Sequence, residues 1–110
     1  MNKARSQHEK ALNDLIHNPH KIGLQKKDLT MIMKEPMLLD NLRIIAEPDI
    51  IFLDRYLNTY LVEYKATNRN TIVEQLDRAY VALQRMQISG NFHKIAVYGG
   101  FRKYKYHHVK

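Results

Sequence analysis

The sequence contains no cysteine, which excludes a disulfide framework and a thiolate metal site. Long hydrophobic runs are also missing: the longest aliphatic stretches span only a few residues, far short of the ~20 that cross a bilayer. The first residues are polar and lack the apolar segment of a signal peptide. We therefore expect a soluble, cytoplasmic protein that does not enter a membrane.

Acidic residues are in the minority. The chain has 11 Asp and Glu against 18 Lys and Arg, which gives a formal net charge of +7. Such a balance favours a polyanionic partner, because binding releases counterions. A basic but inert surface explains the charge equally well. The 110 residues predict a single domain over 1–110 with one core, and we find no repeat, linker or low-complexity segment.

Two segments have the apolar spacing of amphipathic helices. Residues 3–17 place apolar side chains on one stripe, although a capping box from Ser6 to Glu9 also fits a helix that begins only at Ser6. A second capping box opens at Thr71 and leads into a strongly amphipathic helix that ends near Gly90.

Other segments have the β-branched and aromatic content of strands. The clearest are 49–54 and 60–66, joined by a hairpin loop, and 93–98, which we expect Gly99 and Gly100 to break. Earlier in the chain the pattern is weaker: 29–33 and 42–46 look extended, while 35–40 fits either a turn or a short helix. The order predicts an α/β domain with a mixed sheet, in which the strand at 60–66 crosses over through a helix to 93–98.

Three ionisable residues lie close together in this pattern. Asp49 follows Pro48 at the start of one strand, and Glu63 and Lys65 lie two apart in the next. Side chains alternate along a strand, so Glu63 and Lys65 share a face, and pairing of the two strands brings Asp49 beside them. Two carboxylates are costly to bury unless they are paired or hold a cation. This placement suits a divalent metal site for phosphodiester hydrolysis.

The series Pro48-Asp49 and Glu63-Tyr64-Lys65 resembles the PD-(D/E)XK nuclease superfamily. The chain is similar to small archaeal Holliday junction resolvases in its size, its basic charge and the placement of Glu9 before these two motifs. The helix around Gln75 is instead similar to RecB-type nuclease domains. Four residues separate Gln75 from Tyr80, against three in the RecB-type pattern. The resemblance implies a restriction-endonuclease-like α-β-β-β-α-β core, with a mixed central sheet flanked by helices.

The resemblance also implies a set of roles. Asp49, Glu63 and Glu9 would hold Mg²⁺, for which Mn²⁺ would substitute, and the main-chain carbonyl of Tyr64 would complete the shell. Lys65 would orient the attacking water, and Gln75 would reach the same site. The activity implied is an endodeoxyribonuclease, possible substrates of which include branched or junction DNA.

Each of these residues also has an ordinary structural explanation. Asp49 fits turn chemistry after proline, and Glu63 with Lys65 fits an exposed ladder of charges. Glu9 fits the capping partner of Ser6, and Gln75 a residue at the boundary of its helix. The six histidines show no metal-like pairing, and we interpret them as surface or boundary residues.

Basic residues near the end of the sequence are the candidates for DNA contact. Arg102, Lys103 and Lys105 alternate with aromatics, which suits a phosphate backbone and stacked bases, and Arg69 lies in a polar break before the second helix. The same tail fits an edge strand with a solubilising face. One site cuts one strand, so we expect a homodimer. The alternatives are a non-catalytic nucleic-acid-binding module on the same fold, and a structural domain whose acids are ordinary surface residues.

Overall fold

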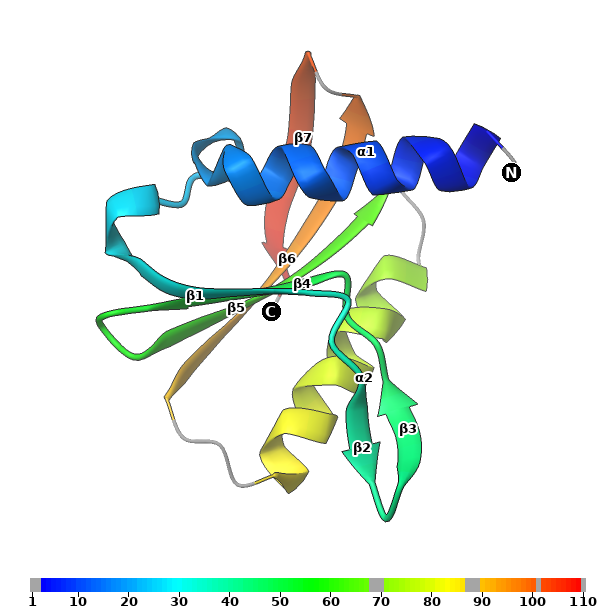
Figure 1. The fold of residues 1–110 in the computed structure, drawn as a ribbon, viewed down its shortest axis with the longest axis vertical. Helices are drawn as coiled ribbons and strands as arrows, with labels where there is room; N and C mark the ends of the chain where they lie inside the picture. Colours follow the sequence, from blue (N-terminus) through cyan, green and yellow to red (C-terminus); the bar gives the residue numbers. More distant parts are fainter. Residues whose placement is uncertain (1–2, 68–70, 87–89, 101, 110) are drawn as a thin grey trace.

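The computed structural model describes residues 3–67, 71–86, 90–100 and 102–109, with side chains from Gln7 onward. Five strands form a mixed sheet in the order β1-β4-β5-β6-β7, and two further strands, β2 and β3, form a separate hairpin (Figure 1). The elements are α1 (Lys3–His17), η1 (Pro19–Ile22), η2 (Lys26–Asp28), β1 (Leu29–Lys34), β2 (Leu38–Asp40), β3 (Arg43–Ala46), β4 (Ile50–Asp54), β5 (Asn58–Lys65), α2 (Thr71–Arg85), β6 (Asn91–Gly100) and β7 (Lys103–Val109).

Helix α1 covers one face of the sheet, as its apolar stripe predicts. Ala11, Leu12 and Leu15 are fully buried and pack against alternate residues of β4, β5 and β6. Because the helix begins at Lys3, a start at Ser6 is wrong. The chain then turns through Pro19, at the first position of η1.

One contact ties the two ends of the described chain together. The Tyr104 hydroxyl on β7 donates to Asp14 Oδ2 of α1 at 2.6 Å, across 90 residues of sequence. Lys21 Nζ of η1 lies 3.0 Å from the same carboxylate oxygen.

Helix α2 covers the opposite face and confirms the predicted crossover. Strands β5 and β6 are parallel neighbours joined through α2, with Lys65 paired to Tyr98 at one end. The buried face of α2 packs against the other set of alternate strand residues, including Leu61 and Ala96. The predicted α/β architecture, a mixed sheet with helices packed on it, is therefore confirmed.

Two sequence predictions need correction. Residues 38–40 form a strand rather than a turn or short helix. Gly99 and Gly100 do not break the last strand before β7, because β6 includes both glycines, pairs with β7 through them and ends only at Gly100. The tail is an edge strand, β7, as one of its two interpretations predicted.

No helix within the described ranges is long and apolar enough to cross a membrane.

Candidate metal and nucleic-acid site

The site lies where β5 extends past its neighbour. Strand β4 begins at Ile50, which pairs with Val62, while β5 continues to Lys65. The backbone of β5 beyond Val62 therefore has an edge that β4 does not cover. Asp49, directly before β4, lies at this uncovered edge.

Asp49 and Glu63 meet there, as the strand pattern predicted. The Asp49 main-chain N–H donates to Glu63 Oε1 at 3.0 Å, and the Tyr64 N–H donates to Asp49 Oδ2 at 2.7 Å. Asp49 is 8% exposed and Glu63 only 2%. An exposed ladder of Glu63 and Lys65 is therefore wrong, since Glu63 is buried.

Burial strongly perturbs Glu63. Loss of solvent, and then the neighbouring Asp49 carboxylate through repulsion and a side-chain hydrogen bond, together raise its pKa to about 9. Both effects favour the protonated form of Glu63. A buried acid that a nearby acid keeps neutral is unusual in a purely structural role, and is common at functional sites.

Lys65 lies on the same sheet face as Glu63 and is partly buried. Its positive charge acts to lower the pKa of Glu63, but this effect is smaller than those of burial and Asp49. The ammonium group is thus close enough to influence the carboxyl pair, as the sequence predicted.

His8 joins the site from α1, which sequence reasoning missed. Its Nε2 lies 3.2 Å from Asp49 Oδ1, and its ring centroid is 6.0 Å from that of Tyr64. The hydrogen bond with Asp49 raises the pKa of His8 and outweighs the opposing effect of burial. His8 is partly exposed, which agrees with a boundary position, but its contact with Asp49 was not predicted. Its helical spacing to Ala11 and Leu12 places it beside the buried face of α1 but does not identify Asp49 as its partner.

Glu9 points to a neighbouring cluster rather than to Asp49. Its Oε2 lies 2.7 Å from Lys34 Nζ, and hydrogen bonds from Lys34 and Glu35 lower its pKa. Burial and the proximity of Glu9 raise the pKa of Glu35. The Glu35 N–H donates to the Asp49 carbonyl at 2.7 Å, so this second acid, which the sequence analysis overlooked, borders the site.

Gln75 faces a separate hollow. The space of about 280 Å³ lies between β3 and α2 and is lined by Ile44, Ile45, Ala46, Glu47, Gln75 and Arg78. The residues described around it do not include Asp49, Glu63 or Lys65. Gln75 Oε1 is buried there without a hydrogen-bond partner among the described atoms. Tyr80 lies further along α2, against Phe92.

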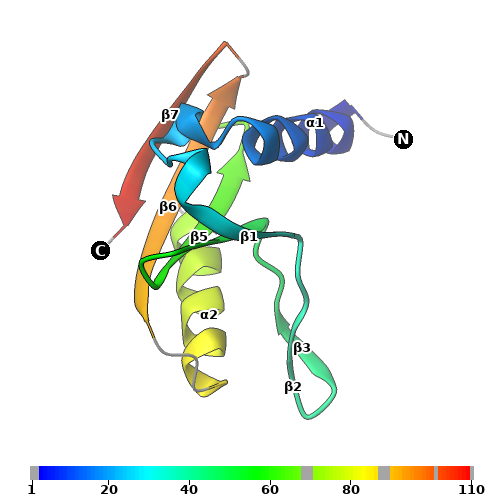
Figure 2. The same ribbon diagram turned by 60° about the vertical axis from the view of Figure 1, so that its left-hand side comes forward.

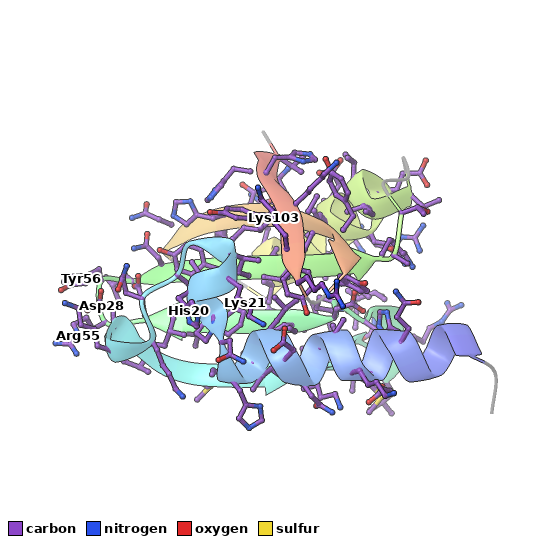
Figure 3. All side chains as sticks on the ribbon, turned by 90° about the horizontal axis from the view of Figure 1, so that it is seen from above. His20, Lys21, Asp28, Arg55, Tyr56 and Lys103 are labelled. Carbon is purple, nitrogen blue, oxygen red and sulfur yellow. The ribbon has the colours of Figure 1, made fainter. Side chains whose placement is uncertain are left out.

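A row of basic residues crosses the sheet at the level of Lys65. Lys65 pairs with Tyr98, and Tyr98 pairs with Lys105 on β7, so the three side chains share one face. Lys103, which Figure 3 marks on β7, and His107 lie two residues before and after Lys105, so they point to the same face. Lys103, Lys105 and His107 are all exposed. Arg102 is exposed in the turn before β7, and Arg69 lies outside the described residues.

The arrangement offers oxygen ligands for a hard cation. Besides the two carboxylates, the Tyr64 carbonyl points to the uncovered edge, because the N–H and C=O of one strand residue face the same side. Within the described residues, no group of three or more His, Cys, Asp or Glu side chains is placed to hold a metal ion. Mg²⁺ is commonly held by one or two carboxylates, with water and substrate phosphate as its other ligands, so the donor set fits it.

Comparisons with protein-family models, curated proteins and solved structures gave no match to this chain.

Proposed function

We propose that the chain is a Mg²⁺-dependent endodeoxyribonuclease whose site is built on Asp49, Glu63 and Lys65. The observation that carries the proposal is the meeting of two buried carboxyl groups, 14 residues apart in sequence, at an uncovered strand edge. Bringing two acids together in a buried place is unfavourable unless a cation compensates.

The residues divide the work according to their chemistry. Asp49 and Glu63 would hold the cation together with the Tyr64 carbonyl, and Glu63 would give up its proton as the cation binds. When bound, Mg²⁺ supplies an activated water and compensates charge on the phosphate. Lys65 would position the water against the phosphate, and His8 would fix the orientation of Asp49 from the side of α1.

The basic row gives the substrate a path to the carboxyl pair. A phosphate backbone laid along Lys103, Lys105 and His107 would reach Lys65 across Tyr98. Alternate residues of a strand recur about every 6.8 Å, which is close to the separation of successive phosphates in a nucleic-acid strand. This geometry favours DNA as the partner over a small phosphate ester.

The element order is consistent with the restriction-endonuclease-like core that the motif suggests. A helix, three sheet strands, a helix and a further strand follow one another as α1, β1, β4, β5, α2 and β6. In this chain the hairpin of β2 and β3 is inserted before β4, and β7 is added at the edge. The candidate residues lie on β5 and just before β4, in agreement with the motif.

A non-catalytic nucleic-acid-binding module is the second candidate. It is favoured by the hydrogen bonds that the two acids already make. The Asp49 carboxylate accepts a hydrogen bond from the Tyr64 N–H at the edge of β5, and the Glu63 carboxyl group accepts one from the Asp49 N–H. A pair that only completes the sheet needs no cation.

Cleavage of a panel of DNA substrates separates the two candidates. Supercoiled, linear and four-way-junction DNA are incubated with Mg²⁺, with Mn²⁺ and with Ca²⁺, which fills oxygen sites. Under the nuclease proposal, Mg²⁺ and Mn²⁺ support strand breaks, and Asp49→Asn abolishes them. Asp77→Asn is the matched control, since this acid pairs with Lys94 on the surface of α2. DNA binding without any cut would favour the binding module.

A further inference from the structure

The β2–β3 hairpin projects from the body of the protein beside α2 (Figure 2). We call residues 37–46 the arm. Leu38 and Ala46 bury its base against α2, while Met37, Leu39, Leu42 and Ile44 are exposed. Several large exposed apolar side chains on one protruding element are typical of an interaction site.

The tip of the arm holds a leucine in an unfavourable conformation. Asn41 and Leu42 have φ values of 50° and 66°, the pattern of a type I′ turn, in which glycine normally takes the second position. Leu42 is nevertheless 94% exposed. A bulky residue with positive φ is costly, and the burial of Leu42 within this chain offers no compensation.

Leu57 provides an internal comparison. It too has a positive φ, 65°, and is 75% exposed. Its conformation, however, has a local cause: the Leu57 carbonyl accepts from the Asn91 N–H, and the Asp54 carboxylate binds the N–H groups on either side, those of Tyr56 and Asn58. The positive φ of Leu57 is therefore explained by the hydrogen bonds of its own turn, whereas no comparable hydrogen bonds are described around Leu42.

A complementary hollow lies beside the arm. It has a volume of about 350 Å³ and lies between β3 and α2, which is enough for a leucine side chain. Apolar atoms of Ile45, Val81 and Ala82 contribute to its wall, and the other lining residues are Asp77, Arg78 and Arg85. Arg85 Nη1 also lies 3.9 Å from Asp40 Oδ2 on the arm, so the hollow adjoins the arm. We call the exposed Leu42 side chain the knob.

Charge points to the occupant. Residues 37–46 carry one acid, Asp40, and one base, Arg43, so the arm is neutral in a chain of net charge +7. Two copies of this chain repel each other overall, but the neutral arm of one copy adds no net repulsion against the hollow of the other, whose lining residues Asp77, Arg78 and Arg85 carry both signs. DNA is drawn instead to the basic row on β7.

We propose that two copies of the chain associate through their arms, with Leu42 of each copy inserted into the hollow of the other that Ile45, Val81 and Ala82 line. The contact is reciprocal, so it closes as a two-fold dimer. It would also place two candidate sites in one assembly, each near an arm, since Glu35, two residues before the arm, donates its N–H to the Asp49 carbonyl. The inference itself rests on the arm and the hollow and not on nuclease activity.

The mass of the whole chain in solution tests the proposal. Light scattering and sedimentation, without metal or DNA, should give twice 13.1 kDa for the native chain. Leu42→Gly, which removes the knob and suits the backbone, should give a monomer. Val81→Arg, which fills the hollow from an exposed helix position, should do the same. Leu57→Gly and Val73→Arg are the matched controls and should remain dimeric.

Mixing the two monomeric variants is the most specific part of the test. A pair of Leu42→Gly and Val81→Arg chains retains one intact knob facing one intact hollow, so partial dimerisation should return. A monomeric native chain, or a Leu42→Gly chain that is still dimeric, would overturn the proposal. Since no DNA or metal is present, the outcome does not depend on whether the protein binds or cleaves DNA.

Discussion

The two ends of the β4–β5 hairpin each hold a buried or partly buried carboxylate, and their environments are opposite. At the turn, Asp54 accepts hydrogen bonds from the N–H groups of Tyr56 and Asn58, the Asn58 amide and the Tyr60 hydroxyl. Burial would raise the pKa of Asp54, but these donors outweigh it and lower the pKa. At the other end, burial and Asp49 raise that of Glu63.

The difference separates a carboxylate that stabilises a turn from a carboxyl group at the candidate site. Asp54 has donors for its charge, so its ionised form strengthens the turn. Glu63 is buried beside another acid, and the Asp49 N–H and Lys65 compensate its ionised form only in part. The same strand pair thus has a structural end and an end at which we propose the site.

The largest expected effect is on cleavage. Asp49→Asn and Glu63→Gln should each abolish strand breakage while the fold persists, because both amides keep the shape but lose a charged cation ligand. Asp54→Asn, at the structural end, should cleave at the native rate. Single-turnover cleavage of supercoiled DNA measures all three. Native activity in either of the first two variants would remove the distinction between the two ends.

Lys65→Ala should lower the cleavage rate by about 10²–10⁴-fold, because the group that positions the water is lost. Metal binding should be retained or improve, since a positive charge beside two carboxyl groups is removed. Metal titration and single-turnover cleavage on the same preparation separate the two effects. An unchanged rate would show that Lys65 only accompanies Glu63 on the sheet face.

Loss of DNA affinity should follow position rather than charge. The double variant with Lys103→Ala and Lys105→Ala should bind DNA more weakly. The slope of log affinity against log salt concentration should become shallower by about 2, because two phosphate contacts are lost. Lys26→Ala with Lys27→Ala removes the same charge from η2, at the structural end, where Asp28 and Arg55 meet (Figure 3). This control pair should bind nearly as the native chain does. Equal losses in both pairs would indicate general attraction by net charge.

The smallest expected effect is on stability. The pKa of Glu63, about 9 when folded, lies above its ordinary value of 4.5, so the folded state holds the proton more tightly. The contribution of the protonated Glu63 to the free energy of unfolding is complete below pH 4.5 and is lost as pH rises through 9. Without metal, Glu63→Gln should therefore raise Tm near pH 8 by about 4 °C or more, and should flatten its pH dependence. Thermal melts between pH 5 and 9 would show a parallel decline in both proteins if Glu63 were not the cause.

Local periodicity was sufficient for much of this molecule. The stripes of α1 and α2 and the alternation of β5 are properties of neighbouring residues, so both helices and the meeting of Asp49 with Glu63 could be predicted. His8 and Glu35 could not be assigned, because their places depend on how α1 and the loop after β1 pack on distant strands. The first strand of the arm, β2, was missed for a related reason: a three-residue strand has too little pattern to distinguish it from a turn. Its partner β3 lies within the segment 42–46 that was predicted to be extended.

The bond between Tyr104 and Asp14 has a consequence for the order of folding. Contacts between residues far apart in sequence are slow to form, because a long loop must close first. During synthesis α1 emerges before β7, and Tyr104 is made 90 residues after Asp14, its partner on α1. The docking of α1 is therefore not complete until β7 has been made, and the nascent protein is exposed to aggregation in that interval.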